Sequence, residues 1–242
     1  MKLDILAFGA HPDDVELTCG GTLIKAVRKG ASVGIISLTR GEMGTRGNEN
    51  LRAEEFEKAA NIIGATVFHP MDLPDSYLVV DKDAKLRVIQ EIRKFKPRLI
   101  LLPYWDDRHP DHGNASRIIE EAAFLSGLKK IDTNQEHYRP AHLIYYMLSW
   151  DFEPDFVVDI TDEMDTKKEA IQAYRSQVHN KSYLRSDDEE ETFISSPQFL
   201  EMLETRASYY GHRIGKKFAE PFKIKTTLEI KDLLDTFGDR VY

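Results

Sequence analysis

The amino-acid sequence predicts an α/β fold, in which helices flank a Rossmann-like, mostly parallel sheet. Strand-like apolar runs alternate with amphipathic, helix-like segments along the chain, and this alternation is typical of an open, doubly wound sheet. Two of the apolar runs are followed by loops rich in His and Asp, at residues 10–16 and 106–112. Because right-handed crossovers bring the loops after parallel strands to one edge, we expect an active site at the carboxyl ends of the strands.

Short apolar runs predict the strands, since parallel strands are buried on both faces. They lie at residues 3–8, 32–38, 65–69, 99–102, 143–148 and 156–160. Amphipathic segments, in which apolar residues recur every three or four positions, predict the helices. These segments lie at residues 20–28, 51–63, 83–95, 114–125, 164–174 and 198–214. The tail beyond Gly215 has a mixed pattern and is left unassigned.

One domain is the expected organisation. The chain has 242 residues, of which 41% are hydrophobic, and this suffices for one large α/β domain with a full core. Because the sequence shows no repeat and no clear linker, we predict a single domain over residues 1–242. Within it, the stretch 182–196 is polar and contains an acidic run at 187–191, which predicts a mobile surface loop.

Composition and charge exclude several classes of function. The formal net charge is -8, which argues against binding to nucleic acid or to an acidic membrane, because either needs a basic surface. No apolar run approaches the roughly 20 residues of a membrane span, and the N-terminus does not resemble a signal peptide. Cys19 is the single cysteine, so a reducing compartment is expected. We therefore expect a soluble cytoplasmic protein.

The two polar loops offer the side chains that a zinc hydrolase needs. The first loop carries His11, Asp13, Asp14 and Glu16, and the second carries Asp106, Asp107, His109, Asp111 and His112. Such an enzyme uses a few imidazole or carboxylate ligands, a base for the attacking water and a group that stabilises the oxyanion. Either cluster alone can be a turn or a helix cap, but two clusters after separate strands favour one shared site. The spacing does not tell which of Asp13 and Asp14 would bind a metal.

These motifs resemble those of a known enzyme family. His11-Pro12-Asp13-Asp14 with Glu16, then Gly20-Gly21-Thr22, and later His109-Pro110-Asp111-His112 are similar to the motifs of the LmbE-like (PIG-L) N-deacetylases. Members of this family are zinc enzymes that remove an acetyl group from N-acetylglucosamine-type sugars. The resemblance runs from Leu3 to about Ile160 and continues at residues 169–177 and 209–222.

The resemblance assigns roles to individual residues. It implies that His11, Asp14 and His112 bind Zn²⁺ and that Asp13 is the general base. It also implies that His109, held by Asp111, acts as an imidazolium that stabilises the tetrahedral intermediate, since a neighbouring carboxylate favours the protonated form of a histidine. Both Asp13 and His109 remain candidates for the group that protonates the departing amine.

The segment at 39–46, together with Arg52 and Glu54-Glu55, most resembles the bacillithiol biosynthesis deacetylases, which act on N-acetylglucosaminyl malate. This implies a small amino-sugar substrate. Arg46 and Arg52 have the side chains to bind a sugar-linked carboxylate with two parallel hydrogen bonds, the alternative being ordinary surface or helix-pairing arginines; the glycine-rich loop before Arg52 favours substrate contact for that residue. It also implies a homo-oligomer, because relatives commonly assemble.

Two alternatives stay close to this interpretation: an amidase of thiol-adduct conjugates, or a deacetylase of another amino sugar. A non-catalytic sugar- or nucleotide-binding protein is an alternative of a different class. The first loop lacks the G-x-G-x-x-G spacing that holds a pyrophosphate, and its two carboxylates would repel phosphate.

Overall fold

The computed structural model describes residues 1–180, 183 and 189–237. Seven strands form one sheet in the order β3-β2-β1-β4-β5-β7-β6. The strands are β1 (Ile5–Gly9), β2 (Val33–Thr39), β3 (Val67–Leu73), β4 (Leu99–Pro103), β5 (His142–Tyr146), β6 (Phe156–Asp159) and β7 (Ala219–Lys223). From β3 to β5 neighbouring strands are parallel, whereas β7 is antiparallel to both β5 and β6. The predicted α/β fold with a mostly parallel sheet is therefore confirmed.

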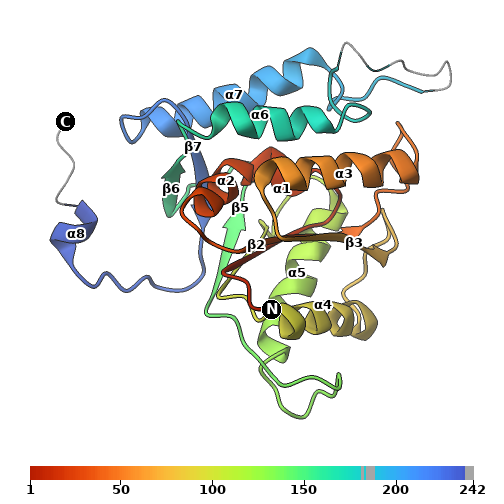
Figure 1. Ribbon diagram of the computed structural model, residues 1–242, viewed down its shortest axis with the longest axis vertical. Coiled ribbons are helices and arrows are strands. Elements are labelled where there is room, and N and C mark those ends of the chain that lie inside the picture. Colours follow the sequence, from red (N-terminus) through yellow and green to blue (C-terminus); the bar gives the residue numbers. More distant parts are fainter. Residues whose placement is uncertain (181–182, 184–188, 238–242) are drawn as a thin grey trace.

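Helices cover both faces of the sheet (Figure 1). They are α1 (Asp14–Thr18), α2 (Gly20–Arg28), α3 (Glu49–Ile63), α4 (Lys82–Phe95), α5 (Pro110–Leu125), α6 (Met164–Ala173), α7 (Pro197–His212) and α8 (Leu233–Phe237). Figure 1 shows α4 and α5 on one side of the strands and α1, α2, α3 and α6 on the other. Two layers of helices around a central sheet give the strand ends a common edge on which a site can form.

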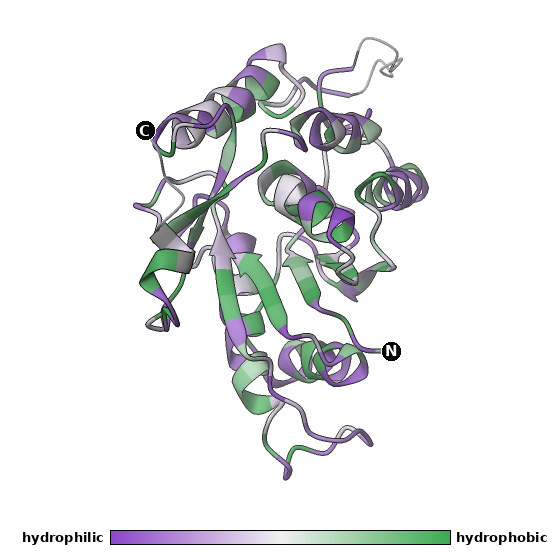
Figure 2. Ribbon diagram, turned by 60° about the vertical axis from the view of Figure 1, so that its left-hand side comes forward, coloured by the Kyte–Doolittle hydropathy of each residue, from purple (hydrophilic) through white to green (hydrophobic). Residues whose placement is uncertain are grey.

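Alternate residues of each central strand enter different halves of the core. Leu6 and Phe8 of β1 pack with α4 and α5, whereas Ile5 and Ala7 of the same strand pack with α2 and α3. Both faces of β1 are therefore buried, which is why this strand reads as an almost continuous apolar run. Figure 2 shows the same feature, because the central strands are largely coloured as hydrophobic.

The structure departs from the sequence-based expectations at several element ends. Helix α5 begins at Pro110, before the predicted residue 114, and α1 was not anticipated. Strand β3 continues through Pro70 to Leu73; it lies at the sheet edge, where a missing N–H is tolerated. Of the predicted loop at 182–196, residue 183 and residues 189–196 are described and carry no helix or strand. Residues 182 and 184–188, with the start of the acidic run, lie outside the described residues.

The helices offer no candidate for a membrane span. In the part of the chain that the structure describes, none of them combines the length and the apolar character that crossing a bilayer requires.

Candidate metal centre and active site

The loops that follow β1 and β4 meet at the carboxyl edge of the sheet. The two strands are direct parallel neighbours, with Ile5 opposite Leu99. As a result, the rings of His11 and His112 lie with their centroids 5.4 Å apart. The structure thus brings together two motifs that are remote in the sequence.

The first loop fixes the Asp14 carboxylate through its own backbone. The N–H groups of Ala10 and His11 donate to Asp14 Oδ2 at 2.8 and 3.0 Å. Asp14 Oδ1 then faces His112 Nε2 at 3.3 Å. One oxygen is therefore held by backbone amides, while the other points to the partner motif.

The second loop orients His112 in a comparable way. His109 caps the N-terminus of α5 and Pro110 occupies its first turn, where its missing N–H costs nothing. His112 Nδ1 lies 2.7 Å from Asp107 Oδ1, and the Asp107 side chain is almost fully buried. A proton on Nδ1, shared with this carboxylate, leaves the lone pair of Nε2 directed at Asp14.

His11 is held by two carboxylates. Its Nε2 lies 3.1 Å from Asp75 Oδ1 and 3.3 Å from Asp111 Oδ2, and its Nδ1 lies 3.8 Å from Asp14 Oδ2. With the proton on Nε2, the lone pair of Nδ1 faces the side of the ring on which Asp14 lies.

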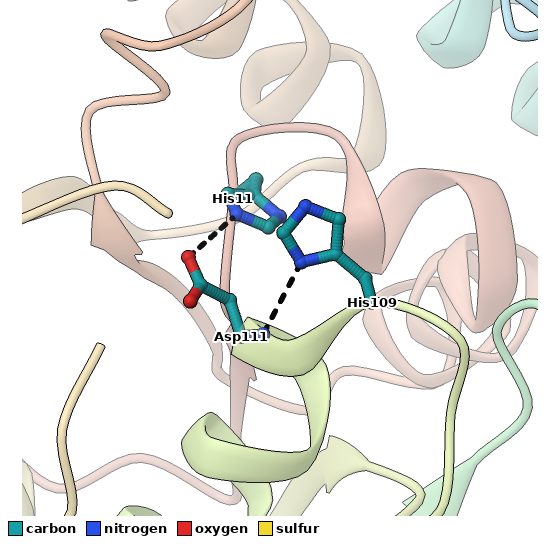
Figure 3. A group of neighbouring side chains, drawn as sticks. All are labelled: His11, His109 and Asp111. Atoms are coloured by element: carbon teal, nitrogen blue, oxygen red, sulfur yellow. Dashed lines mark hydrogen bonds and ion pairs between the residues drawn. The ribbon is translucent and has the colours of Figure 1, made fainter. Parts of the chain in front are cut away.

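Two overlapping groups of side chains among the described residues have the geometry to hold a metal ion. They are His11, Asp14 and His112, and His11, His109 and Asp111, and within each group the ligand atoms lie within 4.8 Å of one another. Figure 3 shows the second group: the Asp111 carboxylate contacts the His11 ring, and His109 Nδ1 accepts a bond from the Asp111 backbone. These two contacts already engage His11 Nε2, the Asp111 carboxylate and His109 Nδ1, which are the atoms that would have to bind a metal ion in this group.

The first group fits a metal ion better. Each of its histidines has one ring nitrogen bound to a carboxylate and the other directed at the shared centre, which is the usual arrangement of a metal-bound imidazole. Burial alone would lower the pKa of His11, but its hydrogen bonds to the Asp111 and Asp75 carboxylates outweigh burial and raise this pKa to about 10. Burial also opposes protonation of His112, yet the Asp14 charge and Asp107 raise its pKa to about 9. The group thus attracts positive charge, which protons or a cation can supply.

Asp13 differs from the other acids of the site. Its carboxylate accepts no hydrogen bond from any described residue, and it lines the cavity next to the metal-binding group. Burial raises the pKa of its carboxyl to about 7, against the pull of the Arg52 guanidinium. Its φ of 110° lies in the left-handed region, which costs a non-glycine residue energy and is common at functional sites. A carboxylate without a partner and with such a pKa suits a general base.

The contact of His109 with Asp111 is not the one that the resemblance implied. Both oxygens of the Asp111 carboxylate accept backbone N–H bonds, from Ser76 at 2.7 Å and Leu78 at 3.2 Å, and one also contacts His11. His109 Nδ1 instead accepts the Asp111 backbone N–H at 3.2 Å. Burial and the nearby His11 and His112 lower the pKa of His109. The geometry therefore corresponds to a neutral His109 with its proton on Nε2, rather than to an imidazolium held by Asp111.

The two arginines expected to bind substrate both have partners within the protein. Arg52 is buried and donates to the carbonyl oxygens of Gly41 and Pro12, so it ties the glycine-rich loop to the first motif. Arg46 is not part of the cavity lining; its guanidinium lies over the Tyr183 ring, with Nε 4.0 Å from Glu189. Arg52 reaches the cavity wall, but two of its nitrogens already have partners.

Asp75 and Asp107 are site residues whose roles the sequence did not reveal. Asp107 belongs to the second polar loop, but nothing in its spacing links it to His112. Asp75 follows β3, and its carboxylate accepts the Met43 N–H at 2.9 Å as well as contacting His11. The available signal was position, because Asp75 stands just beyond a third strand of the parallel sheet, at the same edge as the two motifs.

A cavity of about 490 Å³ opens over the metal-binding group. Its polar lining includes His11, Asp13, Asp14, Asp75, His109 and His112. One wall is apolar and comes from α1, from the segment before α7 and from α7 itself: Leu17, Phe193, Ile194, Phe199, Met202 and Leu203. The volume suits a small molecule of one or two sugar rings.

The fold and this edge together define an α/β protein with a His-Asp-His group that can hold a metal ion beside a free carboxylate. Comparison with known families gives the same answer: the family described as GlcNAc-PI de-N-acetylase (PIG-L) matches residues 6–123. Diacetylchitobiose deacetylase of Thermococcus kodakarensis is 30% identical over 234 residues, which cover 89% of this chain and 80% of that protein. The chain belongs to the PIG-L family of deacetylases.

Two further relatives extend this result. The crystal structure of the conserved protein TT1542 from Thermus thermophilus superposes with a TM-score of 0.85 at 36% identity, covering 95% of this chain and 98% of that one. A probable N-acetyl-alpha-D-glucosaminyl L-malate deacetylase 2 of Bacillus anthracis is 27% identical, over 81% of this chain and 91% of that protein. The protein is thus a deacetylase, a hydrolase that acts on a carbon–nitrogen bond, in a family that depends on metal ions.

Proposed function

We propose that this protein removes the acetyl group from N-acetylglucosaminyl malate and releases glucosaminyl malate and acetate. The observation that carries the hydrolytic part is the meeting of His11, Asp14 and His112 next to the unengaged Asp13 carboxylate. The malate part is supported by the similarity to the Bacillus anthracis protein and by the motif resemblance at residues 39–46 and Arg52.

The same residues support zinc as the bound metal. Two imidazoles and one carboxylate form the ligand set of many catalytic zinc sites, which keep a further position open. A cation held there would lower the pKa of a nearby water molecule and polarise the acetyl carbonyl. Similar ligands also accept iron or cobalt, so elemental analysis of the purified protein tests this assignment.

In the proposed reaction the protein residues handle protons and charge. Asp13 accepts a proton from the water whose oxygen attacks the amide carbonyl carbon. His109, with its proton on Nε2, donates a hydrogen bond to the carbonyl oxygen as that oxygen gains negative charge. Asp13 then returns its proton to the nitrogen, the carbon–nitrogen bond breaks, and acetate and the free amine leave. A base with a pKa near neutrality suits both halves of this sequence.

Comparing three acylated substrates tests the proposal. Release of acetate is measured with N-acetylglucosaminyl malate and with N-acetylglucosamine, and amide cleavage with a thiol-adduct conjugate of the same sugar. The proposal predicts the highest kcat/KM for the malate glycoside. Equal, slow turnover of all three compounds would reject it.

One observation favours a second candidate, an amidase of thiol-adduct conjugates. The apolar wall that includes Phe199 and Leu203 offers contact area for a bulky apolar group, which the malate glycoside lacks. A preference for the conjugate in the same assay would select this candidate.

A further inference from the structure

An anionic substrate requires a cation in this cavity. The cavity lining already contains Asp13, Asp14 and Asp75, and the chain carries a net charge of -8. A dicarboxylate such as malate would be repelled by these groups unless a positive side chain stood near its carboxylates. Among the residues that the structure describes, three arginines and no lysine line the cavity: Arg52, Arg108 and Arg206.

Two of these arginines already serve the backbone. Arg52 donates to the carbonyls of Gly41 and Pro12. Arg206 is half-buried, burial lowers its pKa, and it donates to the Leu148 carbonyl. If Arg52 or Arg206 turned to a substrate carboxylate instead, the carbonyl oxygens that it now serves would lose their donor.

Arg108 differs from both. Its side chain is exposed, and it forms no hydrogen bond or ion pair with any residue that the structure describes. The guanidinium carbon lies 6.0 Å from the centre of the Phe193 ring. Such a contact occupies none of the N–H groups of the guanidinium, and these are the groups that bind a carboxylate with two parallel hydrogen bonds.

The backbone on both sides of Arg108 is also fixed. Asp107 accepts bonds from the His109, Ser149 and Trp150 N–H groups, and His109 caps α5. The backbone of Arg108 is thus held between Asp107 and His109, and its side chain lines the cavity.

We propose that Arg108 is the specificity-determining residue that binds a carboxylate of the group attached to the amino sugar. This inference rests on the proposed function, because it takes the substrate to be an anionic glycoside. It replaces Arg46 and Arg52, which the sequence pattern had suggested for the same contact.

The test pairs an anionic with a neutral substrate. Wild type and Arg108→Gln are assayed with N-acetylglucosaminyl malate and with methyl N-acetylglucosaminide, which has the same acetamide but no carboxylate. Losing a charge-assisted bidentate contact is expected to lower kcat/KM for the malate glycoside about 10- to 100-fold, mainly through KM, and to leave the methyl glycoside within about 3-fold of wild type. Arg108→Lys should fall between the two, since an ammonium keeps the charge but not the planar fork.

Arg117→Gln is the matched control. Arg117 is an exposed arginine on α5 outside the cavity lining, so this variant removes the same charge from the chain and should leave both substrates unaffected. If Arg108→Gln still prefers the malate glycoside as wild type does, or loses kcat/KM equally on both substrates, the role of Arg108 is overturned while the proposed function stands. A wild-type enzyme that does not prefer the malate glycoside would reject the proposed function, and the inference with it.

Discussion

Asp107→Asn probes how the protein prepares His112 for a metal ion. The Asp107 carboxylate lies 2.7 Å from His112 Nδ1 through one oxygen, which also accepts the His109 N–H at 3.1 Å. Its second oxygen accepts the N–H groups of Ser149 at 2.7 Å and Trp150 at 3.2 Å. All four neighbours therefore donate a hydrogen to the Asp107 carboxylate: three are backbone N–H groups, and the fourth is His112 Nδ1, which must carry the proton of the ring.

An asparagine has only one acceptor oxygen, so one set of donors must face its NH₂ group. If the amide keeps Ser149 and Trp150, His112 loses its carboxylate and the tautomer that directs Nε2 at Asp14. Removal of such an orienting partner typically weakens metal binding 10- to 100-fold, or about 1.4–2.7 kcal/mol. Unsatisfied buried donors should in addition lower the free energy of unfolding by about 1–3 kcal/mol.

Competition with a chromophoric chelator measures the zinc affinity, and thermal melting of the metal-free protein measures the stability. Asp106→Asn is the control, because Asp106 is the exposed neighbour and the variant changes net charge equally. Unchanged zinc affinity in Asp107→Asn, or an equal loss in both variants, would refute the assigned role of Asp107.

Three other perturbations have outcomes that the same structure predicts. Asp13→Asn should keep its metal but lower kcat by about 10²- to 10⁴-fold, and retained turnover would exclude Asp13 as the base. In metal-free protein the pKa values of His11 and His112, about 10 and 9, exceed the value of about 6.5 in the unfolded chain. Protonation of these two histidines therefore stabilises the folded state fully below pH 6.5, and this stabilisation is lost as pH rises toward 10. The melting temperature of the metal-free protein should fall over that range. Glu220 and Lys167 form a buried pair at 2.6 Å, so Glu220→Gln should cost about 3–5 kcal/mol in unfolding free energy, and adding Lys167→Met should restore part of it.

The sequence predicted the parts of the fold that depend on local pattern. The parallel strands were found because burial on both faces demands apolar runs such as Leu99–Pro103. The site edge was found because His and Asp clusters follow two of these strands. Strand β7 was missed, since its antiparallel place between β5 and β6 depends on packing with segments far along the chain, and its own residues, with Pro221 inside, do not read as a strand.

Side-chain partners were harder to predict than positions. A guanidinium serves equally well to bind a substrate carboxylate or to satisfy backbone carbonyls, and residue type does not distinguish the two uses. In the structure Arg52 donates to two backbone carbonyls and also lines the cavity, so its contact with a substrate stays a prediction. Asp75 and His11 are 3.1 Å apart only because β3 and β1 flank β2 in the sheet, a fact of topology that no local motif encodes.

The tight turn after β1 explains why one motif can supply both a metal ligand and a base. A Cβ on Gly9 would lie 2.9 Å from the His11 carbonyl oxygen and 3.1 Å from Asp14 Cβ, so only glycine permits the chain to turn so closely. This turn brings the N–H groups of Ala10 and His11 onto the Asp14 carboxylate, and it forces Asp13 into the left-handed region. The adjacent acids thus acquire different surroundings. Burial would raise the pKa of the Asp14 carboxyl, but its histidine and backbone partners outweigh it and lower this pKa. The Asp13 carboxylate accepts no hydrogen bond from the described residues, and burial raises its pKa. Because the backbone between them is strained, two side chains of identical chemistry suit the two different roles proposed for them, a metal ligand and a proton acceptor.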